Sequence, residues 1–271
     1  MSFVDLHCHL LWGIDDGAKT EADALEMARA LFALGYRHVA CSPHARPEFP
    51  SDDPALCERR RAEAQALFQR EGIDLTLHPN AENVLDADLL ERVVERPRPV
   101  GQGPFLLAEA PHLAPLPQLP EILFRLKVKG VTPLVAHPER CREFEKPGRA
   151  EEAVRAGAFL QLDVGALIGR YGRPAQKLAR AFLDQRLYAV AATDLHSPRD
   201  AEKWVGDSIA ALRELAGPAE AAAGDGARRH PARGDAPGAS RCAGGGAEEG
   251  EGALFLVEES HFLIDTRGPD P

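Results

Sequence analysis

The chain has 271 residues, 44% of them hydrophobic, and a formal net charge of −10. This length suits one large α/β domain or two small ones, and such a chain can bury a core without disulfide bonds. The acidic balance argues against a nucleic-acid-binding protein and against docking on anionic lipid. The five cysteines lack framework spacing and the first ten residues lack a signal-peptide pattern, so we expect a cytoplasmic protein without membrane insertion.

Short apolar runs alternate with helix-like stretches through the first 216 residues. Each run is mostly apolar on both faces, which is typical of strands that are covered on both sides. The runs cover residues 3–7, 37–43, 73–77, 104–109, 131–137, 158–164 and 187–193. Seven strand–helix units in series predict a parallel sheet. We expect it to close into a seven-stranded, TIM-like (β/α) barrel, with an open doubly wound sheet as the alternative.

Helix boundary signals lie between these runs. Thr20 and Asp23 have the spacing of a capping box, and Gly35 stands where a C-cap is expected. Pro120 can open a later helix, which Gly130 can end.

The segment 217–252 differs sharply in composition. Of its 36 residues, 23 are Gly, Ala or Pro, and none is Leu, Ile, Val or Phe. Such a segment cannot bury enough apolar surface to offset chain entropy. We therefore predict a barrel domain over 1–216, a disordered segment over 217–252 and a C-terminal tail over 253–271.

Histidines and carboxylates follow six of the seven predicted strands. In a parallel barrel the carboxyl ends of all strands meet on one rim, where active sites lie. The residues that this arrangement brings together are His7, His9, Asp16, His44, Glu82, Glu109, His137, Asp194 and His196.

Each of these residues also has an ordinary structural explanation. A lone histidine at a strand end is more often a hydrogen-bonded core residue, and a lone glutamate is usually solvated. Five imidazoles and four carboxylates in one place would instead repel one another or lack partners without metal. Nine ligands exceed the four that one zinc ion takes, and the mixed donor set suits Mn²⁺, Fe²⁺ or Zn²⁺. Clustered divalent ions serve hydrolysis: they lower the pKa of a bridging water, hold the leaving-group oxygen and can neutralise charge that develops on a phosphoryl group.

Several motifs closely resemble the PHP (polymerase and histidinol phosphatase) family of bacterial protein-tyrosine phosphatases, which belong to capsule and exopolysaccharide loci. The resemblance covers about residues 3–216. The motifs are Asp5-Leu-His-Cys-His9, Gly13-Ile-Asp-Asp-Gly-Ala-Lys-Thr20, Ser42-Pro-His44, Ala136-His-Pro-Glu-Arg140 and Thr193-Asp-Leu-His196.

This resemblance implies a distorted seven-stranded barrel, the PHP fold, with three divalent metal ions that are most often Mn²⁺. By matching position, the first ion would take His7, His9, Glu82 and Asp194. The second would take Glu82, Glu109 and His137, so that Glu82 bridges two ions. The third would take Asp16, His44 and His196. Arg140 resembles the phosphate-binding arginine of the family, Arg199 is a second candidate, and His44 could supply a proton.

We therefore predict a protein-tyrosine phosphatase, a phosphoric monoester hydrolase in which a metal-bridged hydroxide attacks phosphorus. The resemblance implies a tyrosine autokinase of polysaccharide export as the substrate protein, and it leaves the oligomeric state open. The alternatives are a histidinol-phosphate or small phosphomonoester phosphatase, a non-catalytic metal-binding regulator and a C–N hydrolase. The last would want a lysine at a strand end, and the sequence offers no clear candidate.

Overall fold

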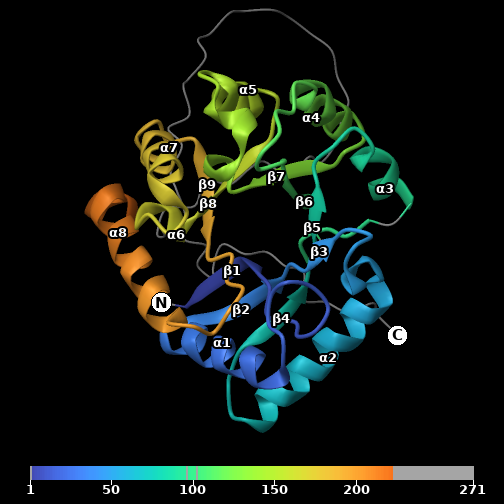
Figure 1. The fold of residues 1–271 in the computed structure, drawn as a ribbon, viewed down its shortest axis with the longest axis vertical. Helices are drawn as coiled ribbons and strands as arrows, with labels where there is room; N and C mark the ends of the chain where they lie inside the picture. The colour runs from blue at the N-terminus through green and yellow to red at the C-terminus, as the bar shows by residue number, and fades with distance from the viewer. Residues whose placement is uncertain (1, 96, 102, 222–271) are drawn as a thin grey trace, which may run out of the picture.

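The structure is a computed structural model, and it describes residues 2–95, 97–101 and 103–221. The strands lie toward the centre of the molecule and the helices lie outside them (Figure 1). The strands are β1 (Phe3–Cys8), β2 (Tyr36–Cys41), β3 (His44–Ala45), β4 (Thr76–Pro79), β5 (Glu82–Val84), β6 (Phe105–Glu109), β7 (Thr132–Ala136), β8 (Phe159–Asp163) and β9 (Tyr188–Ala192). The α-helices are α1 (Glu21–Ala33), α2 (Pro54–Arg70), α3 (Leu89–Glu95), α4 (Leu119–Val128), α5 (Arg149–Arg155), α6 (Val164–Leu167), α7 (Gly172–Asp184) and α8 (Ala201–Ala221). The 3-10 helices are η1 (Pro50–Asp52), η2 (Pro138–Arg140) and η3 (Arg142–Glu145).

The strands form two parallel sheets. One has three strands in the order β1-β2-β4, and the other has six strands in the order β3-β5-β6-β7-β8-β9. Each of the seven apolar runs overlaps one of these strands. The predicted α/β class with parallel strands is therefore confirmed.

The single seven-stranded barrel is not confirmed, because the second and third strand segments of the chain are divided between the two sheets. Pro43 separates β2 from β3 and has no N–H to donate to a ladder. At this break between the two sheets, side-chain hydrogen bonds take the place of backbone hydrogen bonds between strands. The Asn80 amide donates to the Leu6 carbonyl at 3.0 Å and to Ser42 Oγ at 2.9 Å. The third run was expected at 73–77, whereas β4 begins only at Thr76.

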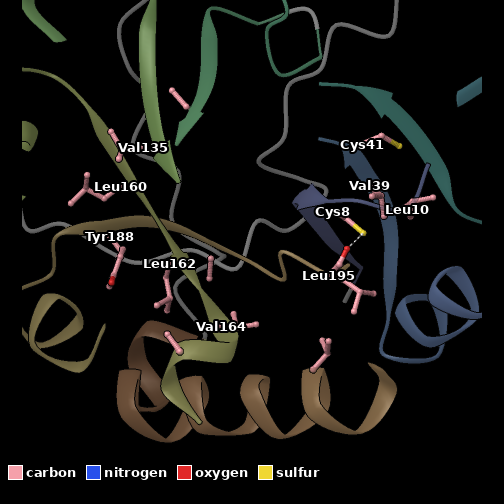
Figure 2. Close-up of a cluster of buried hydrophobic side chains, with 14 of the residues drawn as sticks. Cys8, Leu10, Val39, Cys41, Val135, Leu160, Leu162, Val164, Tyr188 and Leu195 are labelled. Carbon is pink, nitrogen blue, oxygen red and sulfur yellow. Dashed lines mark hydrogen bonds between the residues drawn. The ribbon is translucent and has the colours of Figure 1, made fainter. Parts of the chain in front are cut away.

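The two sheets also meet where β1 ends beside the segment that follows β9. The Asp194 N–H donates to the His7 carbonyl, and the His9 N–H donates to the Leu195 carbonyl, each at 2.9 Å. A single bridge pairs Cys8 with Leu195, and the Cys8 thiol lies 3.7 Å from the Leu195 carbonyl oxygen (Figure 2). Three residues of the predicted metal set, His7, His9 and Asp194, therefore lie directly at this junction.

Apolar side chains pack in two clusters. The larger one contains residues of both helices and strands, among them Val135, Leu160 and Leu162 (Figure 2). The smaller one consists of Val4, Leu6, Ala40, Val100, Leu107, Leu134 and Ala136. Since the strand residues of this smaller cluster come from both sheets, the sheets face each other across it.

The predicted helix boundaries are confirmed at α1 and α4. The Thr20 hydroxyl accepts from the Asp23 N–H, and the Asp23 carboxylate accepts from the Thr20 N–H, which completes the capping box. Gly130, after α4, has φ +76°, a conformation that glycine adopts without strain. None of the helices in the described ranges is long and apolar enough to cross a membrane.

The end of the predicted first domain is not tested. Helix α8 continues to Ala221, past residue 216. The rest of the segment predicted to be disordered and the whole tail 253–271 lie outside the described residues.

Candidate metal centre

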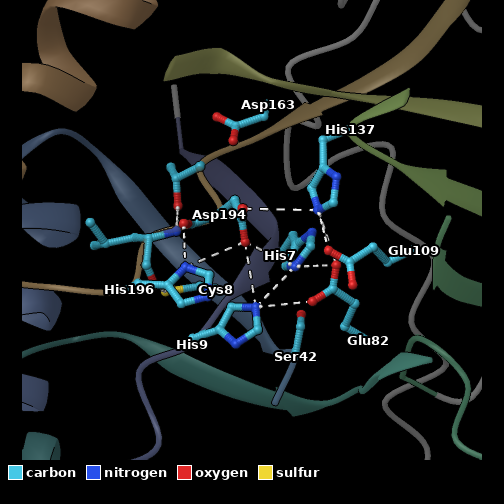
Figure 3. A network of polar contacts seen from close by, with 12 residues as sticks. His7, Cys8, His9, Ser42, Glu82, Glu109, His137, Asp163, Asp194 and His196 are labelled. Atoms are coloured by element: carbon cyan, nitrogen blue, oxygen red, sulfur yellow. Dashed lines mark hydrogen bonds and ion pairs between the residues drawn. The ribbon is translucent and has the colours of Figure 1, made fainter. Parts of the chain in front are cut away.

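All nine predicted metal ligands lie close together in the structure. Figure 3 shows most of them in one polar network, with side chains from several strand ends pointing toward one another. Each of the nine belongs to at least one group of potential ligands whose donor atoms lie within 4.8 Å of one another. Four groups together contain all nine: His7–His9–Asp194, His7–Glu82–His137, His44–Glu82–Glu109 and His9–Asp16–His44–His196. A fifth group joins His137 to His112 and Cys141.

Two histidines of the first strand segment form the middle of this network. The pairing of β1 with β2 shifts register between Asp5 and Cys8, and such an irregularity can re-aim a side chain. The Nε2 atoms of His7 and His9 lie 3.0 Å apart. Asp194 Oδ1 lies 3.1 Å from the first of these nitrogens and 3.4 Å from the second. The three donor atoms therefore converge.

Two of the predicted ligands, one histidine and one aspartate, have a positive backbone φ angle. His137, directly after β7, has φ +30°, and Asp194, after β9, has φ +50°. A positive φ is uncommon for residues other than glycine, and such conformations cluster at functional sites. Each residue turns the chain at a strand end, so that the His137 side chain points toward Glu82 and the Asp194 side chain points toward His7.

The loop after β1 supports His9. Asp15 accepts from His9 Nδ1 at 2.9 Å and from the Gly17 N–H at 2.9 Å. A Cβ atom at Gly17 would lie 2.0 Å from the His9 carbonyl oxygen. Only glycine therefore allows this loop to fold so closely onto the histidine.

Glu82 is the central carboxylate. It lies 3.0 Å from His137 Nε2, 2.8 Å from His44 Nδ1, and 3.5 Å from the Nε2 atoms of His7 and His9. Its side chain is almost wholly buried. A carboxylate with four imidazoles around it has the position that a ligand shared between two ions requires.

Asp16, His44 and His196 form a more open group on the same side. Asp16 Oδ1 lies 3.2 Å from His44 Nε2 and 3.4 Å from His196 Nε2. The His196 ring stacks on His9 with 3.8 Å between centroids. Burial lowers the pKa of His44, but Asp16 and Glu82 outweigh burial and raise this pKa to about 10.

Burial and charge oppose each other at the buried carboxylates. Burial raises the pKa of Glu82, but His7 and His137 outweigh it and hold the pKa well below its usual value. The pKa of Asp194 is lowered in the same way, because His7 outweighs burial. Burial, and then Arg140, lower the pKa of His137 to about 4. At neutral pH the acids are ionised and His137 is neutral, which are the forms that bind metal. The raised pKa of His44 keeps its ring protonated, so an ion bound there must displace that proton.

The donor atoms fit a divalent cation better than they fit one another. Asp194 Oδ1 and His44 Nδ1 are buried without a hydrogen-bond partner, although His7 Nε2 and Glu82 Oε2 lie within 3.1 Å of them. Bonds of about 2.1 Å to one ion place neighbouring donors about 3 Å apart. Imidazole nitrogens and carboxylate oxygens are the ligands that Mn²⁺, Fe²⁺ and Zn²⁺ accept.

These residues open onto a cavity of about 470 Å³. Arg140 lines it and is held by two carboxylates and one ring: it pairs with Asp194, donates to Asp163 at 3.0 Å, and lies 4.1 Å from the centroid of Tyr171. The other lining residues are Asp16, His44, Arg46, Glu82, Glu109, Pro111, His112, Leu113, His137, Asp194 and His196.

The structure does not bring Arg199 into this lining. Its side chain is exposed, and its N–H donates to Ser197 Oγ at 3.2 Å. Its role in phosphate binding remains a prediction. Arg46, which pairs with Glu109, was missed by sequence reasoning because it stands in no recognisable motif.

Comparison with known proteins gives a consistent result. The family model for capsular polysaccharide synthesis proteins CpsB/CapC matches residues 3–221. The tyrosine-protein phosphatase YwqE of Bacillus subtilis is 30% identical over 197 residues, which cover 72% of this chain and 77% of YwqE. The tyrosine-protein phosphatase CpsB of Streptococcus pneumoniae is 24% identical over 202 residues, 72% of this chain and 83% of CpsB.

A solved structure agrees with these matches. It comes from a study of YwqE from Bacillus subtilis and CpsB from Streptococcus pneumoniae, described as metal-dependent tyrosine phosphatases. It superimposes with a TM-score of 0.73 and 27% sequence identity, and the match covers 78% of this chain and 86% of that chain. The chain therefore belongs to the CpsB/CapC family, as its motifs indicated.

Proposed function

We propose that this member of the CpsB/CapC family is a metal-dependent protein-tyrosine phosphatase. One observation carries the proposal: nine imidazoles and carboxylates converge beside Arg140 in a single cavity. Relatives with the same fold are named tyrosine-protein phosphatases.

We propose three divalent ions, with Mn²⁺ as the most suitable and Fe²⁺ or Zn²⁺ as alternatives. The ligand sets are those expected from the resemblance, with Glu82 shared between two ions. The overlapping groups of donor atoms support this assignment, since Glu82 belongs both to a group with His137 and to a group with Glu109. The third set, Asp16, His44 and His196, falls within one group.

Ions bound here would supply an acidified water as the nucleophile and neutralise charge on the phosphoryl group. The protein contributes orientation. Arg140 is fixed by Asp163 and by the face of Tyr171, so its remaining N–H groups can bind phosphoryl oxygens without first being ordered.

Hydrolysis forms one P–O bond to the oxygen of water and breaks the P–O bond to the tyrosine oxygen. The leaving phenolate needs little protonation, because the pKa of tyrosine is about 10. His44 lines the same cavity and is the imidazole we assign to proton transfer where the leaving group needs it.

We propose phosphotyrosine in protein as the substrate and a tyrosine autokinase of polysaccharide export as the partner, in the cytoplasm. The family description, capsular polysaccharide synthesis, supports the partner. The four cysteines of the described residues are free and buried, in accord with reduced thiols.

The test combines elemental analysis of the purified protein with phosphatase assays with and without added Mn²⁺. We expect bound divalent metal and hydrolysis of a phosphotyrosine peptide that Mn²⁺ increases. Faster turnover of histidinol phosphate or another small monoester would favour the alternative phosphatase. Bound metal without hydrolysis of any phosphoester would favour a regulator.

A further inference from the structure

Each histidine of the first strand segment presents one ring nitrogen to the metal cluster and the other to an outer partner. His9 Nδ1 faces a carboxylate oxygen of Asp15 at 2.9 Å. His7 Nδ1 faces the side-chain amide of Gln161 at 3.2 Å. His7 and Gln161 are wholly buried, so no solvent can substitute for either contact.

These outer partners decide which ring nitrogen carries the proton. A neutral imidazole that binds metal through Nε2 must carry its hydrogen on Nδ1, and that hydrogen needs an acceptor. The Asp15 carboxylate can only accept. It therefore holds His9 in the form in which Nε2 is free for a metal ion.

Gln161 differs because a carboxamide can both donate and accept. In the structure its Nε2 faces His7 Nδ1, and its Oε1 is buried without a hydrogen-bond partner. With the amide in this orientation, His7 carries its hydrogen on Nε2, which lies 3.1 Å from Asp194 Oδ1. The two ends of the amide have nearly the same shape, so they can exchange by rotation of the terminal torsion.

We propose that Gln161 is a positioning residue whose amide rotates when His7 binds metal. The rotated amide turns its oxygen to Nδ1, accepts its hydrogen and leaves Nε2 as a ligand. The same side chain thus supports His7 both without and with the ion. The buried oxygen without a partner points to this role, because burying an amide whose oxygen has no partner is unfavourable.

The inference rests on the metal binding in the proposed function, but not on phosphatase activity. Two substitutions separate positioning from packing. Gln161→Leu removes both the donor and the acceptor. Gln161→Glu supplies an acceptor only, as Asp15 does for His9. Gln65→Leu is the matched control, since Gln65 on α2 bonds to Leu75 and Leu77 away from the cluster.

The experiment titrates Mn²⁺ into metal-stripped full-length protein and follows heat and bound ions per chain. We expect Gln161→Leu to weaken one site by about 10–100-fold, the usual effect of losing such a partner. We expect Gln161→Glu to bind at least as tightly as the wild type and the Gln65→Leu control to bind unchanged. Nitrogen-15 NMR of the metal-free proteins should show the His7 hydrogen on Nε2 in the wild type and on Nδ1 in Gln161→Glu.

Equal Mn²⁺ affinity in Gln161→Leu and the wild type would overturn the inference. So would a loss in Gln161→Glu as large as in Gln161→Leu, because that is the result of a packing role. A wild-type protein that binds Mn²⁺ without hydrolysing phosphoesters would refute the phosphatase proposal alone. A wild-type protein that binds no divalent ion would overturn both.

Discussion

Arg140 donates to Asp163 across 3.0 Å, and this contact ties the only arginine of η2 to the end of β8. Asp163 is itself fixed, since its other oxygen accepts from the Gly165 N–H at 2.8 Å and caps α6. The guanidinium is thus held at the cavity wall by a side chain that cannot move freely.

Arg140→Lys should lower kcat/KM for a phosphotyrosine peptide by about 100–1000-fold, the usual effect of losing one fixed donor to developing charge. Lysine keeps the charge but not the planar fork that binds two phosphoryl oxygens. Steady-state kinetics measures the effect, and bound Mn²⁺ should stay at the wild-type level. Wild-type kinetics in Arg140→Lys would remove this arginine from phosphate binding.

His137→Ala should lose metal and activity together. The imidazole is buried, and its Nε2 lies 3.0 Å from Glu82. Its removal leaves that carboxylate and any ion with one donor fewer. His38→Ala is the control, because His38 contacts His78 on β4 and belongs to none of the donor groups. Full turnover by metal-stripped His137→Ala would refute a metal-dependent mechanism.

Chelation should destabilise the protein. An ion present at 100 times its Kd stabilises the folded state by about 2.7 kcal/mol, which raises Tm by about 5–10 °C in a domain of this size. Thermal unfolding with and without a chelator measures the shift, and restored Mn²⁺ should reverse it. An unchanged Tm would show that the cluster holds no ion.

The free energy of unfolding should fall in acid because of His78. Burial, and then His38, lower the pKa of His78 from 6.5 to about 4. Between pH 6.5 and pH 4 the His78 side chain is protonated in the unfolded chain but neutral in the folded chain. The contribution of neutral His78 to the free energy of unfolding is therefore fully present above pH 6.5 and is lost as the pH falls toward 4. His78→Gln should flatten this part of the stability curve of metal-stripped protein in urea titrations. A curve of unchanged steepness would contradict the assignment.

Leu113 should favour aromatic substrates. It lines the cavity and is 89% exposed, while the backbone around it is fixed: the Leu116 N–H donates to Glu143 and the Arg142 N–H donates to the His112 carbonyl. Leu113→Ser should raise KM for a phosphotyrosine peptide by about 3–10-fold, as expected for lost apolar contact. KM for glycerol phosphate, which has no ring, should not change. An equal rise for both substrates would contradict a contact with the ring.

The sequence predicted the strands better than it predicted how they pair. Apolar runs identify strands because both faces are buried, but they carry no signal for the break at Pro43, where side chains of Ser42 and Asn80 replace ladder bonds. Closure into one barrel depends on such local bonding, which composition and periodicity do not report.

The site was predictable where its residues follow strand ends in recognisable motifs. Residues that contact those side chains but lie outside the motifs were missed by sequence reasoning. Arg46 and Tyr171 stand in no motif. Gln161 did leave a signal, since it and Asp163 are the two polar residues inside the apolar run that contains β8. A polar side chain within a strand that is covered on both sides needs a buried partner, and that requirement could have identified it.

The junction between Cys8 and Leu195 places the closure of the fold and two of the proposed ligands in one short stretch of chain. There the Asp5 carboxylate accepts from the Thr193 N–H at 3.1 Å and from its hydroxyl at 2.5 Å, so the first strand is fastened to the stretch that follows the last one. A deletion of this stretch would remove Asp194 and His196 together with the contacts between Asp5 and Thr193. A chain truncated before Thr193 should therefore lose stability and the proposed ligands at once, because both depend on the same few peptide units.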